Sequence, residues 1–208
     1  MKVCFLTSGF SNGFPNDFIH EIKKHLSPVN QLAFVASDFS AHEKTVKYKD
    51  LFVKWFSDCG IVFESTTIVD NCLSPKEADQ VIRMSNVVWL SGGPTLTQIA
   101  DIKRYELIPA LCERDGITIG MSAGSINMAK RVVLAKDESD GIPELAVYDG
   151  IGLVDLNIEP HIQNAAEQHL MDVVRAAKIS PIIGLPDDSF IVDVNGVYSI
   201  FGKHRLYP

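Results

Sequence analysis

The chain has 208 residues, of which 46% are hydrophobic and 22% charged, and its formal net charge is −7. This length suits one domain with a full hydrophobic core, and the composition excludes an intrinsically disordered chain. The acidic balance, with no stripe of Lys and Arg, argues against a nucleic-acid partner, because phosphate binding needs concentrated positive charge.

Strand-like and helix-like segments alternate through the first part of the chain. Short β-branched or apolar runs predict strands at residues 2–8, 31–36, 62–69, 87–90 and 117–121. Longer amphipathic runs predict helices at 16–26, 41–59, from Ser74 onward, and at 102–114. This alternation is typical of parallel strands with helices packed on both faces.

The last third of the chain is richer in strands. Strands are expected at 132–134, 156–158, 181–185, 190–194 and 197–201, with one helix at 165–178. Asn195-Gly196 predicts a tight hairpin between the last two strands. We therefore predict a single α/β domain over residues 1–208, in which a mostly parallel sheet carries an antiparallel extension.

The N-terminal segment and the cysteines favour a cytoplasmic protein. The apolar run at 1–8 is shorter than a secretory signal, and no run reaches the length of a membrane span. The cysteines show neither a CxxC motif nor a Cys/His metal spacing; they are Cys4, Cys59, Cys72 and Cys112. We expect reduced, buried thiols and no metal or organic cofactor.

The segment GMSAG at 120–124 fits the G-x-S-x-G pattern of a nucleophile elbow. In such an elbow a tight strand-to-helix turn lifts the nucleophile above the sheet, and the flanking glycines let the turn close. A strand is predicted before Ser122 and a helix over 123–130, as the motif requires. Ser122 is therefore the expected nucleophile, whereas Ser125 is expected to hydrogen-bond the backbone of the same turn.

The segment SGGPT at 91–95 follows the fourth predicted strand. Acyl transfer needs two N–H donors aimed at the developing oxyanion, and the N–H groups of Gly93 and Ala123 are the candidates. Pro94 has no N–H to donate. The same segment also suits an ordinary strand-to-helix turn that ends at Pro94.

A serine nucleophile needs a base, and histidine is the usual one. His161 lies just past a predicted strand end, and His169 lies on a predicted helix. The other histidines are expected at the surface: His20, His25, His42 and His204. Asp187 is the first candidate for the acid that orients the imidazole, and Asp188, Asp137 and Asp155 are alternatives.

Four segments, taken in order, resemble the peptidase family that contains aspartyl dipeptidase (dipeptidase E) and cyanophycinase. They are SGGPT at 91–95, GMSAGS at 120–125, NIEPH at 157–161 and GLPD at 184–187. The resemblance implies a class I glutamine amidotransferase-like, flavodoxin-like sandwich. It also implies a catalytic triad of Ser122, His161 and Asp187, with Gly93 and Ala123 at the oxyanion hole.

The chain departs from the family pattern at three places. Asp187 stands where the family usually has Glu, and Pro94 stands where it commonly has Asn. The segment after His161 has no arginine, whereas the dipeptidase branch carries one there. A bidentate arginine is the natural partner of a substrate carboxylate, so these residues argue against a preference for an N-terminal aspartate.

The leading hypothesis is hydrolysis of small peptides through an acyl-enzyme, with no nucleic-acid or membrane partner. One alternative is an amidase or esterase that acts on a non-peptide small molecule. The other is a catalytically silent, ligand-binding relative, which the changes at Asp187 and Pro94 favour. A glutamine amidotransferase is disfavoured because its nucleophile is cysteine, and residue 122 is serine.

Overall fold

A central sheet organises the computed structural model, which describes residues 1–138 and 140–208. Within these residues the sheet has seven strands in the order β11-β10-β1-β5-β4-β2-β3. The parallel strands are β1 (Lys2–Thr7), β2 (Gln31–Val35), β3 (Ser65–Val69), β4 (Val87–Leu90) and β5 (Gly116–Met121). The antiparallel extension beside β1 is formed by β10 (Phe190–Val194) and β11 (Val197–Phe201). The predicted fold class, a mostly parallel sheet with an antiparallel extension, is confirmed.

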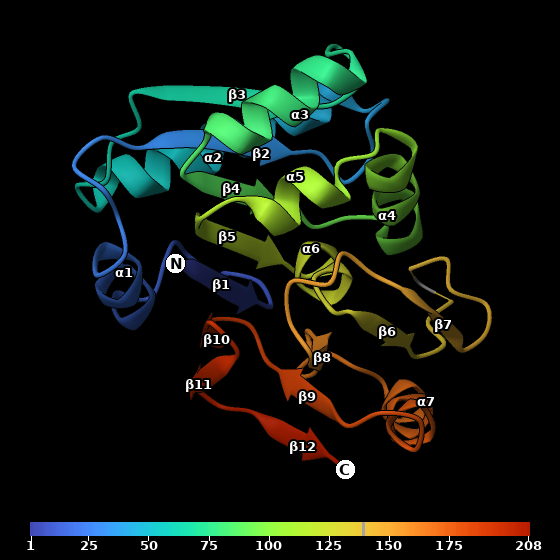
Figure 1. The fold of residues 1–208 in the computed structure, drawn as a ribbon. Helices are drawn as coiled ribbons and strands as arrows, with labels where there is room; N and C mark the ends of the chain where they lie inside the picture. Colours follow the sequence, from blue (N-terminus) through green and yellow to red (C-terminus); the bar gives the residue numbers. More distant parts are fainter. Residues whose placement is uncertain (139) are drawn as a thin grey trace.

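Helices cover both faces of this sheet (Figure 1). On one face lie α1 (Asn16–Lys23) and α2 (His42–Asp58). On the other lie α3 (Pro75–Met84), α4 (Thr95–Arg104), α5 (Ile108–Glu113) and α6 (Ala123–Asn127). The strands supply both cores because alternate side chains point to opposite faces. In β1, Phe5 packs with α1 and α2, whereas Leu6 packs on the opposite side.

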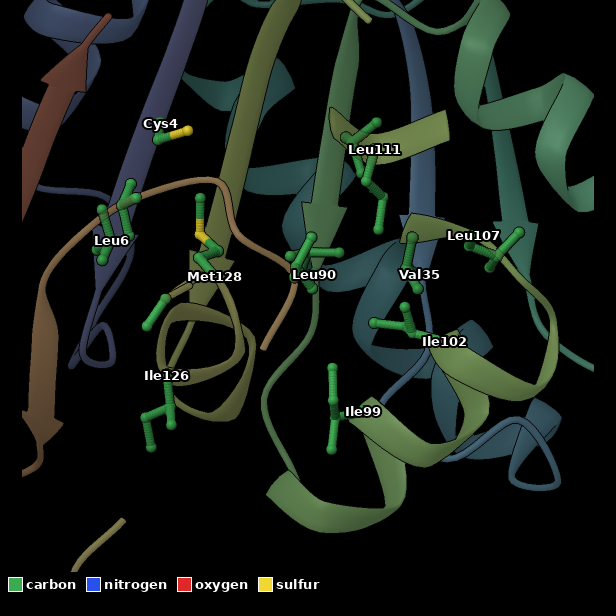
Figure 2. Packing of buried hydrophobic residues seen from close by; sticks show 14 of the residues in the cluster. Cys4, Leu6, Val35, Leu90, Ile99, Ile102, Leu107, Leu111, Ile126 and Met128 are labelled. Carbon is green, nitrogen blue, oxygen red and sulfur yellow. The ribbon is translucent and has the colours of Figure 1, made fainter. Parts of the chain in front are cut away.

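Aliphatic side chains fill the core under α4 and α5. Figure 2 shows Val35 and Leu90 of the sheet facing Ile99, Ile102 and Leu111 of these helices. All five are at most 5% exposed. Full burial of an aliphatic side chain of this size contributes about 1.5–3 kcal/mol, so this layer fixes how the loop after β4 approaches the sheet edge.

Two smaller sheets extend the carboxyl edge of the central sheet. One contains β8 (Asn157–Pro160), β9 (Ile182–Leu185) and β12 (Arg205–Tyr207), and the other pairs β6 (Arg131–Leu134) with β7 (Ala146–Asp149). Helix α7 (Glu167–Ala177) packs its apolar face on β6, β9 and β12. Strands β8 and β9 are parallel neighbours, with Pro160 opposite Leu185, so the residues that follow them emerge side by side.

The expected helix at 102–114 is wrong. Helix α4 starts earlier, at Thr95, and ends at Arg104, and α5 is a separate short helix from Ile108. Glu106 breaks the run with a left-handed φ of 57°, and Pro109 in the first turn of α5 has no N–H for a continuous helix.

Other elements also begin or end at residues that differ from the predicted ones. Helix α6 ends at Asn127, short of the predicted 130, because the chain turns there into β6. Strand β3 starts at Ser65 rather than at 62, and β7 and β12 had not been predicted. The hairpin at Asn195-Gly196 is confirmed, and both residues have positive φ angles.

Cys72 corrects the expectation that the thiols are buried. Cys4 is buried, but Cys72 is exposed in the turn after β3, where the chain has left the sheet. The cysteines carry no disulfide within the described residues. Across the same residues, no helix is long and apolar enough to cross a bilayer.

Candidate active site

Ser122 occupies a strained turn between β5 and α6. Its φ of 50° and ψ of −112° lie outside the regions that non-glycine residues ordinarily adopt. Such geometry costs about 1–3 kcal/mol and persists only where its surroundings enforce it. Here the Ser122 N–H donates to Thr7 O at 2.9 Å, and its carbonyl accepts from Ile126 N–H at 3.0 Å.

The two motif glycines are required by close packing of this turn. A Cβ on Gly124 would lie 2.1 Å from the carbonyl oxygen of Leu90, and one on Gly120 would lie 2.6 Å from the Ser125 nitrogen. Both obstacles are backbone atoms, which cannot swing aside as a flexible side chain can. The Ser125 hydroxyl is engaged with the backbone of β1: it donates to Thr7 O and accepts from the Thr7 N–H.

Three side chains from separate elements form one chain of hydrogen bonds. Ser122 Oγ lies 3.0 Å from His161 Nε2, and His161 Nδ1 lies 2.7 Å from Asp187 Oδ1. A ring that carries its proton on Nδ1 donates to Asp187 and leaves Nε2 free to accept from the serine hydroxyl. This is the arrangement in which an imidazole acts as a general base towards a hydroxyl nucleophile.

Strand pairing explains why the histidine and the acid meet. His161 directly follows β8, and Asp187 follows β9 after one proline, so both leave neighbouring parallel strands at the same edge. The aspartate reaches the ring although it is shorter than glutamate. Asp188 instead accepts from the Ser11 N–H at 2.9 Å, and Asp137 Oδ2 lies 3.9 Å from His169 Nδ1.

Sequence reasoning missed the residues that hold this acid in place. The hydroxyl of the fully buried Ser8 donates to Asp187 Oδ1 at 3.0 Å and accepts from the His161 N–H at 2.8 Å. Gln163 donates to Asp187 Oδ2 at 2.6 Å and accepts from the Asp187 N–H at 3.0 Å. The available signal was the position of Ser8 just past β1, the strand that neighbours β5.

Gly9 leaves room for the histidine–aspartate pair. A Cβ at this position would lie 2.6 Å from Asp187 Oδ1 and 2.9 Å from His161 Cε1. The backbone of Gly9 also accepts from the Asp188 N–H at 2.8 Å, which ties the loop after β1 to the loop after β9. The absence of a side chain here therefore lets the two loops close around the pair.

The loop after β4 lies beside Ser122. A Cβ on Gly92 would approach the Ser122 Cβ to 3.4 Å, whereas Gly93, with φ 146°, faces Ser37 Oγ. Pro94 precedes the first residue of α4. Ala123 is the first residue of α6, where the N–H groups of a first turn have no helical acceptor. Ala123 therefore directly follows Ser122, and in the loop after β4 it is Gly92, the residue before Gly93, that comes close to Ser122.

A pocket of about 650 Å³ opens beside His161. It lies between α6, the segment after β6 and the start of α7. Its lining carries carboxylates and few cations, and includes Lys136, Asp137, Glu138, Glu159, Asp172 and Arg175. Arg175 is paired with Asp172 at 2.7 Å, and Lys136 with Glu138 at 2.7 Å. The pocket therefore offers no unpaired arginine for a substrate carboxylate within the described residues.

An ion pair forms part of the pocket wall. His169 Nε2 lies 3.1 Å from Glu159 Oε1, and its Nδ1 donates to Lys136 O at 2.9 Å. The hydrogen bond to Glu159 raises the pKa of His169 to about 9, with a further contribution from the Lys136 carbonyl. Burial raises the pKa of the Glu159 carboxyl, and the bond to His169 opposes that rise. His169 is therefore protonated at neutral pH.

Solved structures define the class of fold. The chain superposes on a peptidase from an acI-B1 Actinobacterium with a TM-score of 0.71 and 15% identity, covering 98% of this chain and 88% of that one. It superposes on a putative peptidase E protein from Listeria monocytogenes EGD-e with a TM-score of 0.67 and 20% identity, covering 99% and 98%. The fold is therefore the α/β sandwich shared with peptidase E-like proteins.

Sequence comparison gives the family. The sequence model of peptidase family S51 matches residues 5–199, and the chain belongs to this family. Peptidase E from Nostoc sp. is 26% identical over 201 residues, covering 90% of this chain and 79% of the relative. Peptidase E from Salmonella arizonae is 26% identical over 173 residues, covering 77% and 72%. The expected family resemblance is confirmed.

Proposed function

We propose that the chain is a serine peptidase that hydrolyses small peptides through an acyl-enzyme. The observation that carries this proposal is the hydrogen-bonded series Ser122–His161–Asp187, with spacings of 3.0 and 2.7 Å. Membership of a peptidase family supports the reaction class. The free cysteines suit a reducing compartment such as the cytoplasm, where we propose that it works.

The reaction begins when His161 Nε2 takes the proton of the Ser122 hydroxyl as its oxygen attacks the peptide carbonyl. Asp187 holds the ring in the required tautomer and stabilises the imidazolium that forms. The imidazolium then gives its proton to the leaving amine, and the acyl group stays on Ser122. Water, deprotonated by His161, hydrolyses the ester and restores the free hydroxyl.

The negative charge that develops on the carbonyl oxygen needs preorganised donors. We assign this role to the N–H groups of Ala123, the first residue of α6, and of Gly93, in the loop that brings Gly92 close to Ser122. Ala123 follows Ser122 directly, as in other nucleophile elbows. Each such donor contributes about 10²–10³ in kcat where it has been removed in other enzymes.

The substrate pocket argues against an acidic first residue. The carboxylates that line it outnumber the cationic side chains, and its arginine, Arg175, is already paired with Asp172. We therefore propose that peptides with neutral or basic residues next to the cleaved bond are better substrates than peptides that begin with aspartate.

The test is a panel of small peptides, together with a fluorophosphonate probe that labels activated serines. We expect hydrolysis by the wild type, labelling at Ser122 located by peptide mapping, and loss of both in Ser122→Ala. Ser11→Ala is the matched control, because Ser11 contacts Asp188 through its backbone only. Undiminished hydrolysis by Ser122→Ala would refute the proposal. Labelling without peptide hydrolysis would point to an amidase or esterase.

A further inference from the structure

We propose that His42, Asp70 and Cys72 form a binding site for a divalent transition-metal ion of the zinc type. His42 begins α2, and Asp70 and Cys72 lie in the turn that follows β3. One ligand atom from each residue, an imidazole nitrogen, a carboxylate oxygen and a thiol sulfur, lies within 4.8 Å of the other two. The three residues thus supply three of the four ligands of a tetrahedral site.

The spacing of the ligand atoms suits a tetrahedral ion. Bonds of about 2.0–2.1 Å to nitrogen and oxygen and about 2.3 Å to sulfur place tetrahedral ligand atoms roughly 3.3–3.6 Å apart. Cys72 Sγ already lies 3.4 Å from His42 Nδ1. His42 Nδ1 and Asp70 Oδ2 are 2.6 Å apart, the distance of a hydrogen bond in which Nδ1 carries the proton. Replacing that proton by the ion requires this pair to open by roughly 0.7 Å, and the half-exposed His42 ring has room to move.

The carboxylate at the centre of the cluster is preorganised. Asp70 is completely buried, and its second oxygen accepts from the Cys72 N–H at 2.9 Å. The turn is held in place from two sides: Asn71 N–H donates to Phe39 O at 3.1 Å, and Leu73 N–H donates to Asp70 O at 3.2 Å. Such supporting bonds orient a metal-ligating carboxylate before the ion arrives.

The ligand set selects the kind of ion. A thiolate and an imidazole favour zinc and its transition-metal neighbours, whereas Ca²⁺ and Mg²⁺ require oxygen ligands. A thiolate and a carboxylate together neutralise a divalent charge, which suits the buried Asp70 oxygen. Cys72 is exposed, so water completes the fourth position.

The site is separate from the candidate active site and does not depend on its function. Strand β3 is at one edge of the sheet, and β2 and β4 lie between it and β5, which carries Ser122 (Figure 1). A bound ion would link the start of α2 to the turn before α3. The bound ion would therefore stabilise the fold at this edge rather than enter the reaction at Ser122.

A cobalt titration of the full-length, reduced and chelator-treated protein tests the site, because Co²⁺ reports thiolate ligation by absorption. We expect one equivalent to produce a near-ultraviolet thiolate-to-cobalt charge-transfer band and visible bands of a four-coordinate ion. Zn²⁺ should then displace the cobalt and remove both sets of bands.

Two variants that each lack one cysteine show whether the band depends on Cys72. Cys72→Ser should fold, because its side chain is exposed, and should lose the charge-transfer band. Cys59→Ser is the matched control: this cysteine ends α2 and is not part of the cluster, so the band should persist. No charge-transfer band in the wild type, or an unchanged band in Cys72→Ser, would overturn the proposal and leave His42 and Asp70 as a simple hydrogen-bonded pair.

Discussion

Replacing Ser8 by alanine tests the support of Asp187 separately from Asp187 itself. Ser8 is fully buried, and its hydroxyl joins two members of the series by donating to Asp187 and accepting from the His161 N–H. Ser8→Ala removes both bonds and leaves the partly buried N–H of His161 without its acceptor. The Asp187 carboxylate keeps Gln163 as a donor, so it remains near the ring but is held less firmly.

The two hydrogen bonds that Ser8→Ala removes set the size of the loss in stability. A buried donor left unsatisfied costs about 1–3 kcal/mol, and a hydrogen bond to a charged group contributes about 1.5–3 kcal/mol. We expect Ser8→Ala to lower the free energy of unfolding by about 2–4 kcal/mol, because Asp187 retains its other donor. For a chain of this size that is a fall in Tm of roughly 4–16 °C. Looser positioning of the acid should reduce kcat by about tenfold with little change in KM.

Ser85→Ala is the control for this measurement. Ser85 is 6% exposed, its hydroxyl donates to Val81 O at 2.8 Å, and it precedes β4, away from the strand ends that hold the site. This variant should lose about 0.5–1.5 kcal/mol of stability, but its kcat should stay within about twofold of the wild type, since its bond does not reach the series. Thermal unfolding and steady-state kinetics on the best peptide of the panel give both quantities. Equal kcat values for the two variants would refute the positioning role of Ser8.

Three further predictions concern the same region. Asp187→Asn should lower kcat by about 10³–10⁴ with little effect on KM, because the amide favours the wrong tautomer of His161; steady-state kinetics would show it, and a loss under tenfold would contradict the assignment. Gly9→Ala should push both side chains aside, reduce kcat/KM about a hundredfold and lower stability by about 1–3 kcal/mol; unchanged kcat/KM would contradict the packing argument. His169 has its pKa raised from 6.5 to about 9, so its pairing with Glu159 stabilises the fold fully below pH 6.5 and is lost as pH rises through 9. Thermal unfolding from pH 6 to 10 should show Tm falling in that window, and His169→Gln should flatten the fall; an unchanged profile in the variant would count against the pairing.

Local patterns made part of the site predictable. The elbow at Ser122 needs a strand, a tight turn and a helix in immediate succession, and the glycines on either side are within two residues. The hairpin at Asn195-Gly196 is equally local, because two positive φ angles decide it. In contrast, the prediction of one helix at 102–114 was wrong. It followed the apolar periodicity of that segment and gave too little weight to Pro109, which lies in the first turn of a separate helix.

Contacts between distant segments were not predictable in the same way. Ser8 and His161 are 153 positions apart, and a serine after a first strand has no distinctive pattern. His42 and Cys72 are 30 positions apart, so a search for close Cys and His spacing passes over them. The choice between Asp187 and Asp188 likewise depends on the turn after β9, where Asp188 has a φ of 64° and its side chain binds the backbone of Ser11.

By itself, the sequence predicted the α/β alternation, the tight turn at Ser122 between a strand and a helix, and the likeness to one peptidase family. These follow from short-range rules, since hydrophobic periodicity and turn chemistry act over a few residues. Only the tertiary structure decided which acid meets His161, that Ser8 and Gln163 hold it, and that the neighbouring pocket is lined by carboxylates. Those outcomes depend on which strand ends lie side by side, and strand order is set by packing across the whole chain rather than by any local segment.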